Sequence, residues 1–379
     1  MSAPAQVPAQ KPHEAWFEDT WWYAVKKRLQ WTGWLQYIPN LVAATLALLL
    51  AGIAALIGIA PAFTAWPLFI ISLLLYGNAL FDVATVRFGW HPAEKLPAAR
   101  DGMDAFDLAR ARKSCRSFQK RKLSDAHRDR LIALAERAAQ PEACIGSAPI
   151  RFEYLNAPLT VWPVVGAQEF LVAIAPREYH ELAVVDIGRS LQKVVLEATR
   201  MGVATCWIGP GADPSSIAEN LGPRFDAARD HVICVCAIGY KSRYIPLSVR
   251  FMTRSMSDRK AMSELFFADT SFSKPLDPAA APYAEFGRSY EICQWSPSSY
   301  NGQTSRAVAL VEGGKVSRVD FCAATKSRYY AMVALGIWIA NWEWGCAALG
   351  IDGRVEVLST EGENRPELPR YVASWRRAA

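Results

Sequence analysis

The sequence predicts an α+β body made of two fused copies of one unit, preceded by a two-helix transmembrane hairpin. Two observations support this prediction. Residues 41–87 contain two long apolar runs joined by a short linker, and two pairs of similar segments recur in the same order after residue 100. The chain has 379 residues, of which 51% are apolar and 11% aromatic, so it can bury more than one core. This composition excludes a mainly disordered protein.

The two apolar runs match the thickness of a bilayer. They read LVAATLALLLAGIAALIGIA (41–60) and PLFIISLLLYGNALFDVATV (67–86), and twenty helical residues rise about 30 Å. The linker between them is short enough only for a tight hairpin, so residues 41–87 form one unit. Asp82 lies near the end of the second run, where a carboxylate can reach the interface. A buried hairpin in a soluble core is the alternative, and the near absence of polar residues disfavours it.

Basic residues flank the hairpin at both ends and are absent from its linker, which predicts that both ends lie in the cytoplasm. These residues are Lys26, Lys27, Arg28, Arg87, Lys95 and Arg100. Residues 1–40 form an expected interfacial amphipathic segment, because five tryptophans accompany the first basic group. The apolar run is too long and too far from Met1 for a signal peptide. We therefore expect a multi-pass protein of the inner membrane with its body on the cytoplasmic side.

The soluble body contains an internal repeat. VVDIGRSLQKVVLEATRMGVATCWIG (184–209) aligns with MVALGIWIANWEWGCAALGIDGRVEVL (332–358), with Gly188 matching Gly336. Both glycines lie inside predicted helices, where glycine is unfavourable, so each should mark a close approach by another helix or a ligand. Upstream, 131–155 matches 286–311. These matches predict lobe 1 at 101–250 and lobe 2 at 263–365, joined by a linker within 254–275.

The two copies differ where a ligand would bind. The second copy has Ser298, Ser299, Asn301 and Gln303 where the first has Glu142, Ala143, Ile145 and Ser147. Such uncharged donors and acceptors could clamp a planar polar ligand, or form an ordinary turn.

Conversely, only the first copy has Arg112, Ser114 and Arg116, alternating before a helix that Ser124 is expected to cap. On an extended segment these three side chains would point the same way and could grip a phosphate. A solvated basic face is the alternative. We therefore expect each copy to hold half of one site.

Charge and cysteine content exclude other classes. The 42 basic residues are interleaved with 36 acidic ones, so the net charge of +6 does not indicate a nucleic-acid partner. The eight cysteines form no CxxC pair, and the histidines are scattered, so no metal site is expected. Cys234 and Cys236 alternate in HVICVCAIG, which predicts a buried strand.

Three motifs together resemble the nitroreductase-like FMN-dependent oxidoreductases. Along the chain they are RKSCRSF, then GVATCWIG directly after the predicted helix at 184–200, then the Pro-Ser-Ser-x-Asn-x-Gln stretch, and the resemblance covers about 108–360. The family typically forms homodimers that bind FMN at the subunit interface. This chain resembles an internally duplicated branch, a pseudo-dimer in one polypeptide, so that a monomer could be complete.

The resemblance implies the roles of particular residues. Arg112, Ser114 and Arg116 would hold the FMN phosphate and ribityl chain, and Ser298, Asn301 and Gln303 would reach the flavin from the other half. The loop over the isoalloxazine would comprise Thr205, Cys206, Trp207, Ile208 and Gly209. Lys241 or Arg243 matches a late basic residue that often closes on the phosphate. The flavin would carry the chemistry, so no catalytic side chain is expected.

The chain also departs from the family pattern. Gln303-Thr304-Ser305 stands where Gln-Pro-Trp is frequent, and each copy lacks half of the motifs, which predicts one FMN per chain. NADH or NADPH would share the flavin cleft, since no GxGxxG marks a separate nicotinamide domain. The acceptor would be a small molecule, of a lipophilic, nitro or quinone type. The alternatives are a membrane-anchored flavin-binding redox sensor or scaffold, and a flavin-free pseudoenzyme.

Overall fold

The computed structural model describes residues 35–378, except 59, 160, 163, 210, 211, 256, 257 and 359–366. The expected interfacial segment at 1–40 lies mostly outside these residues. The α-helices are α3 (Ile38–Ile57), α4 (Ala65–Asp82), α5 (Ala105–Ala111), α6 (Asp125–Ala138), α7 (Glu181–Arg200), α8 (Pro214–Leu221), α9 (Leu247–Ser255), α10 (Ser289–Gln294) and α11 (Tyr330–Ala348). A π-helical turn, Val83–Arg87, extends α4.

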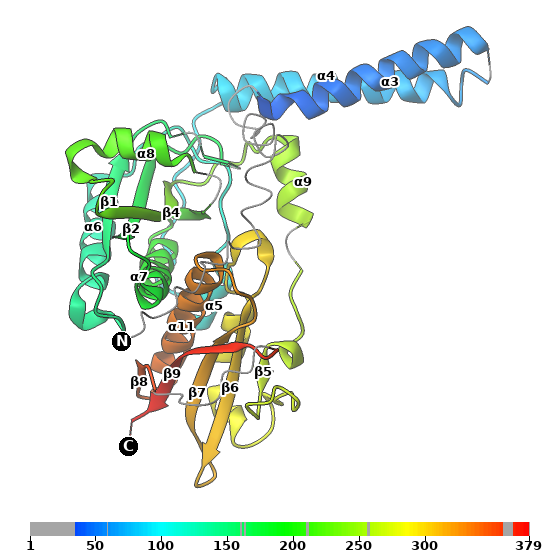
Figure 1. Ribbon diagram of the computed structural model, residues 1–379. Coiled ribbons are helices and arrows are strands. Elements are labelled where there is room, and N and C mark those ends of the chain that lie inside the picture. The colour runs from blue at the N-terminus through cyan, green and yellow to red at the C-terminus, as the bar shows by residue number, and fades with distance from the viewer. Residues whose placement is uncertain are drawn as a thin grey trace, which may run out of the picture.

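Helices α3 and α4 form an antiparallel hairpin that projects away from the rest of the protein (Figure 1). Both are long and apolar enough to cross a membrane, with mean hydropathies of 2.3 over Ile38–Ile57 and 1.8 over Ala65–Arg87. Their outward leucines, isoleucines and phenylalanines are exposed. Only small or polar side chains are buried between them, such as Ala44 and Ser72, whose Oγ donates to the carbonyl oxygen of Ala44 at 2.8 Å.

Each lobe contains an antiparallel sheet with the same strand order. Lobe 1 has the order β1-β2-β4-β3, with strands β1 (Arg151–Asn156), β2 (Glu169–Pro176), β3 (Ala204–Ile208) and β4 (Asp230–Gly239). Lobe 2 has the order β6-β7-β9-β8, extended at one edge by β5, with strands β5 (Phe266–Phe267), β6 (Ser305–Glu312), β7 (Lys315–Ala323), β8 (Gly353–Glu356) and β9 (Arg370–Arg377).

In each lobe a long helix follows the second strand, α7 in lobe 1 and α11 in lobe 2. The fold is therefore α+β, and the two lobes share one strand order. Strand β9 lies beyond residue 365, the predicted end of lobe 2. The predicted domain boundaries stay predictions.

Helices α7 and α11 pack against each other at the centre of the molecule (Figure 1). Gly188 and Gly336 make this approach reciprocal. A Cβ at Gly188 would collide with the carbonyl oxygen of Val333, and a Cβ at Gly336 would collide with that of Val185. The sequence prediction that both glycines mark a close approach is confirmed, and the partner of each is the other helix.

Local sequence explains several element boundaries. Ser124 caps α6, since its Oγ accepts from the N–H of His127 at 3.3 Å, as predicted. Cys234 and Cys236 are buried in β4, also as predicted. Helix α11 is apolar around most of its circumference, which is typical of a buried helix.

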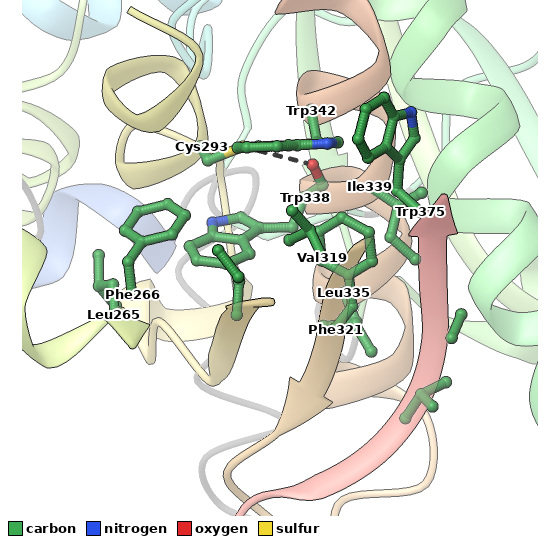
Figure 2. Close-up of a cluster of buried hydrophobic side chains, with 14 of the residues drawn as sticks. Leu265, Phe266, Cys293, Val319, Phe321, Leu335, Trp338, Ile339, Trp342 and Trp375 are labelled. Atoms are coloured by element: carbon green, nitrogen blue, oxygen red, sulfur yellow. Dashed lines mark hydrogen bonds between the residues drawn. The ribbon is translucent and has the colours of Figure 1, made fainter. Parts of the chain in front are cut away.

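The core of lobe 2 is rich in aromatic side chains (Figure 2). Trp338 stacks on Phe266 with ring centroids 4.9 Å apart, and Trp342 stacks on Phe286 at 4.8 Å. Val184 and Val185 of α7 belong to the same cluster, so the core continues across the boundary between the lobes. Trp338 and Trp342 are thus core residues.

Candidate functional site

A cleft opens between the two lobes, near the start of α11. The centre of a water molecule can reach about 140 Å³ of it. Six segments line it: the chain before α6, the loop near Trp162, strands β3 and β4, the turn before β6, and α11. The lining residues are Ser114, Arg116, Trp162, Trp207, Ile208, Gly209, Ile233, Cys234, Pro297, Ser298, Ser299, Tyr300, Tyr329, Tyr330, Val333, Ala334 and Ile337.

The segment that carries Ser114 and Arg116 lies beside the start of β3. Ser114 forms a parallel bridge with Thr205, and the N–H of Cys115 donates to the carbonyl oxygen of Thr205 at 2.8 Å. Because alternate side chains of an extended segment point to opposite sides, Ser114 and Arg116 reach the cleft while Cys115 enters the core. Thr205 itself is buried and does not line the cleft.

The end of β3 and the start of α11 form the apolar part of the cleft. Trp207, Ile208 and Gly209 contribute one side, and Gly209 lies close to the ring of Tyr330. Ala334 and Ile337 contribute side chains from one face of α11. Two tryptophans and three tyrosines in the lining provide flat apolar surfaces suited to an aromatic ring.

The turn before β6 contributes Ser298 and Ser299 to the cleft lining. The side-chain amides of Asn301 and Gln303 in the same turn point away from the cleft. Asn301 donates from Nδ2 to the carbonyl oxygen of Asp258 at 2.7 Å, and Gln303 accepts from the N–H of Lys260 at 2.8 Å. Both amides therefore hold the connection between the lobes and do not line the cleft. Tyr300, Asn301 and Gln303 have positive φ values of 50°, 56° and 46°. Such strained backbone clusters at binding sites.

Three guanidinium groups gather behind this turn, and we call them the guanidinium cluster: Arg110, Arg112 and Arg259. The guanidinium carbons of Arg110 and Arg259 lie 3.7 Å and 5.2 Å from the ring centroid of Trp295. Arg259 also donates to Oδ1 of Asn301, which belongs to the turn that lines the cleft. Arg112 is 8% exposed.

The cluster carries positive charge that the described residues compensate only at Arg110, which pairs with Glu291 at 3.0 Å. Burial, and then the charge of Arg259, lower the pKa of Arg112 to about 10. Burial also raises the pKa of the adjacent thiols Cys206 and Cys236, so they stay neutral at pH 7 and give Arg112 no counter-ion. Nη1 of Arg112 and Nε of Arg259 are buried and have no hydrogen-bond partner among the described residues. An anion would satisfy these groups.

The structure thus brings six of the ten predicted site residues to one cleft: Ser114, Arg116, Trp207, Ile208, Gly209 and Ser298. Arg112, Thr205, Asn301 and Gln303 lie behind its walls. Lys241 and Arg243 lie elsewhere. Lys241 pairs with Phe118, and the N–H of Arg243 donates to Glu94 at 2.7 Å. Sequence reasoning missed Arg259, although it falls within the predicted linker, because a lone arginine in a loop carries no motif.

Residues 105–343 match the family model described as "Putative TM nitroreductase", and this range is more than half of the chain. The chain belongs to this nitroreductase family. No curated protein matched the chain.

Solved structures with similar folds include a "putative nitroreductase" from Thermotoga maritima. It is 17% identical, with 75% of this chain and 98% of that one covered and a TM-score of 0.45. A nitroreductase with bound FMN from Desulfitobacterium hafniense is 18% identical, with 38% and 93% covered and a TM-score of 0.31. One from Desulfovibrio desulfuricans, in complex with FMN, is 20% identical, with 37% and 87% covered and a TM-score of 0.30.

The side chains that line the cleft of this nitroreductase-family protein fit a flat ligand with a negatively charged tail. Tryptophan, tyrosine and aliphatic side chains would face the flat part. Arg116 reaches the cleft, with its Nη1 3.4 Å from Oγ1 of Thr253 and its buried Nε without a partner among the described residues. Nε1 of Trp207, which has no partner within the described part of the chain, is a further donor in the lining.

Proposed function

We propose that this protein is a membrane-anchored flavin oxidoreductase that holds one FMN in the cleft between its lobes. The observation that carries the proposal is that Ser114 and Arg116, the end of β3 and the turn at Ser298 line a single cleft, although they come from both copies. FMN would supply hydride chemistry, accepting a hydride from NADH or NADPH at N5 and passing electrons to an acceptor.

The residues of this chain would bind and orient the cofactor. Arg116 would hold the phosphate, since its buried Nε has no partner among the described residues, and the positive charge of the guanidinium cluster behind the turn would favour an anion there. Ser114 and Ser298 would bond to polar groups along the tail. Trp207 and Tyr330 would pack against the ring and exclude water. Asn301 and Gln303 would act indirectly, by fixing Arg259 and the chain around it.

The apolar hairpin supports the proposal that the protein is anchored in a bilayer. Many large apolar side chains of α3 and α4 are exposed, including Leu56 at 90% and Phe63, in the linker between them, at 84%. Such a surface needs a covering of lipid or protein. The flanking basic residues support the proposal that the body lies on the cytoplasmic side of an inner membrane. An acceptor dissolved in the bilayer, of the quinone or nitro type, would reach a body tethered there.

The absorption spectrum of detergent-purified protein tests the cofactor. We expect a yellow protein with about one FMN per chain, and anaerobic NADH or NADPH should bleach it. Yellow protein that neither nucleotide bleaches would favour the second candidate, a redox sensor, which the departure at Gln303-Thr304-Ser305 also favours. Colourless protein that does not bind added FMN would exclude both the oxidoreductase and the flavin-binding sensor.

Substitution of Arg116 tests the position of the phosphate. Arg116→Ala should weaken FMN binding about 10- to 150-fold, because a hydrogen bond to a charged group contributes about 1.5–3 kcal/mol. Dissociation constants from flavin fluorescence measure this. Arg229→Ala is the matched control, since that side chain is 83% exposed and lies outside the cleft lining. Equal affinity of the Arg116 variant and wild type would show that the phosphate binds elsewhere.

Fractionation and protease access test the membrane assignment. The full chain should remain with membranes after high-salt washing. The body should be cleaved in inverted inner-membrane vesicles and protected in intact spheroplasts. Extraction by salt alone, or cleavage from the outer face, would contradict the anchor or its orientation respectively.

Turnover with quinones of long and short tail, in liposomes, tests the acceptor. A bilayer-dissolved acceptor predicts faster turnover with the long-tailed quinone. Equal rates would count against a lipophilic substrate while leaving the flavin assignment intact.

A further inference from the structure

A second cavity lies at the base of the membrane hairpin, and we call it the junction cavity. The centre of a water molecule can reach about 240 Å³ of it. It is enclosed by the turn that ends α4, the connector after it, residues 117–121, Ser242 and Tyr244. The chain that passes the cleft continues into this cavity, since Ser114 and Arg116 line the cleft while Ser117 to Arg121 line the junction cavity. None of the roles proposed above uses it.

Positive charge dominates the described lining. Lys120 donates from Nζ to the carbonyl oxygen of Arg87, and Lys120 and Arg121 pair with no carboxylate among the described residues. The acid in that lining, Glu94, already accepts from Oγ of Ser242 at 2.9 Å and from the N–H of Arg243 at 2.7 Å. Burial, and then the charge of Arg87, lower the pKa of Lys120. A bound anion would relieve this repulsion.

Aromatic residues beside the cavity indicate that it would lie at the level of lipid headgroups. Phe88 and Trp90 stack with centroids 5.2 Å apart and are 52% and 74% exposed, directly after α4. Exposed aromatic side chains at the end of an apolar helix are typical of the membrane–water interface. His91 stacks on Tyr244 at 4.2 Å and forms part of the cavity wall.

The base of the hairpin is fixed to the body. Oδ2 of Asp82 accepts from the N–H of Leu247 at 3.0 Å, which ties α4 to the start of α9. The hydrogen bond from Lys120 to the carbonyl oxygen of Arg87 also joins the end of the hairpin to the body. The cavity is therefore part of the connection between hairpin and body, and a ligand there would contact both.

We propose that the junction cavity binds the phosphate of an anionic phospholipid, with Lys120 and Arg121 as its cationic contacts. Phosphate oxygens accept strong hydrogen bonds from lysine and arginine, and a lipid would present its phosphate at this depth. The inference rests on the membrane anchoring proposed above and is independent of the flavin.

Binding of short-chain lipids to the full chain in neutral detergent tests the proposal. Dihexanoyl phosphatidylglycerol should bind at least tenfold more tightly than dihexanoyl phosphatidylcholine. Lys120→Gln/Arg121→Gln should abolish this preference, while Lys274→Gln/Lys315→Gln, which removes two lysines of lobe 2 that do not line the cavity, should retain it. Arg121→Gln alone should weaken it, and the Arg121 side chain makes no hydrogen bond to another described residue. No preference, or a preference that survives in the double variant, would overturn the site.

Two further measurements separate the possible failures. Inorganic phosphate that binds as tightly as phosphatidylglycerol would assign the cavity to a soluble anion and overturn the lipid. Flotation with neutral vesicles reports on the hairpin. Protein that floats without preferring phosphatidylglycerol contradicts only the lipid site, whereas protein that fails to float contradicts the anchor on which it rests.

Discussion

The two lobes share one strand order and differ in the turn before their first long strand. In lobe 2, the N–H groups of Asn301 and Gly302 donate to the carbonyl oxygens of Ser298 and Ser299, so the turn is closed by its own backbone. In lobe 1, the equivalent N–H groups of Ile145 and Gly146 each donate to the carboxylate of Asp186 at 2.8 Å. The turn of lobe 2 can therefore line a cleft, whereas the turn of lobe 1 is hydrogen-bonded to α7.

The helices explain this difference. With Gly188 aligned to Gly336, Ala334 and Ile337 of α11 correspond to Asp186 and Arg189 of α7. The first pair lines the cleft. The second pair fills the equivalent region of lobe 1, where Arg189 donates to the carbonyl oxygen of Ala143 and pairs with Glu343 at 2.6 Å. We call Asp186 and Arg189 the plug. Small and apolar side chains leave room for a flavin, whereas the plug occupies that room, so the comparison favours one FMN per chain.

Copying the plug into lobe 2 should have the largest effect. Ala334→Asp would place a carboxylate at the buried wall of the cleft without the two N–H donors that Asp186 has, and an uncompensated buried charge costs several kcal/mol. We expect near-complete loss of FMN, measured as flavin absorbance per chain. Ala334→Ser is the small polar control and should retain most of the flavin. Wild-type FMN content in the Asp variant would mean that the cleft is not the flavin site.

Breaking the ion pair of the plug tests how it is held. Burial alone would raise the pKa of Glu343, but Arg189 and Lys193 outweigh burial and hold it below its usual range. Glu343→Gln should lower the free energy of unfolding by about 3 kcal/mol at pH 7, because Arg189 then stays buried without a full partner. This is the lower end for buried pairs, since the Glu343 side chain is 21% exposed.

The pH dependence of that loss is its check. A carboxyl group whose pKa is lower in the folded state stabilises the protein above its unfolded pKa of about 4.3, and this contribution disappears as the pH falls. Denaturant titrations of wild type and variant should therefore converge towards pH 3. A gap of constant size would show that the loss arises from packing.

The reciprocal glycines test the contact on which both lobes depend. Gly336→Ala should cost about 2 kcal/mol, because collision with the carbonyl oxygen of Val185 outweighs the gain in helix propensity. Gly188→Ala should behave similarly, since it meets Val333. Gly102→Ala is the control, because a Cβ there has no neighbour within 4 Å. Thermal unfolding measures all three, and a stabilised Gly336 variant would contradict the close packing of α7 and α11.

The sequence was most informative where a pattern had a direct physical cause. Apolar length predicted α3 and α4, paired interior glycines predicted a close helix contact, and Ser124 was recognisable as a cap. The repeat predicted two lobes, and the shared strand order agrees with it. Alternation predicted correctly that Ser114 and Arg116 point together. It failed for Arg112, which follows the end of α5 and is directed into the core.

The remaining features depend on tertiary contacts that no local pattern encodes. Asn301 and Gln303 resemble ligand contacts in sequence, yet strained backbone turns their amides towards the chain at Asp258–Lys260. Arg259 joins the guanidinium cluster only because that chain passes behind the turn. The plug was hidden for the same reason, since Asp186 and Arg189 have the appearance of polar residues on an amphipathic helix.

Replacing the acid of the plug should have the smallest effect and the opposite pH dependence. Burial raises the pKa of Asp186, although the N–H groups of Ile145 and Gly146 and the charge of Arg189 oppose the shift. Asp186→Asn keeps one acceptor oxygen, so we expect a change of only about 1 kcal/mol at pH 7.

A carboxyl group with a raised folded pKa favours the folded state below its unfolded pKa of about 3.9, and this contribution is lost as the pH rises. The stability of wild type relative to Asp186→Asn should thus fall as the pH rises above about 4, whereas relative to Glu343→Gln it should rise as the pH approaches about 4.3 and then level off. Matching slopes for the two variants would mean that Asp186 and Glu343 titrate as one unit, and that the plug is a single ionic network rather than a carboxylate held by backbone amides.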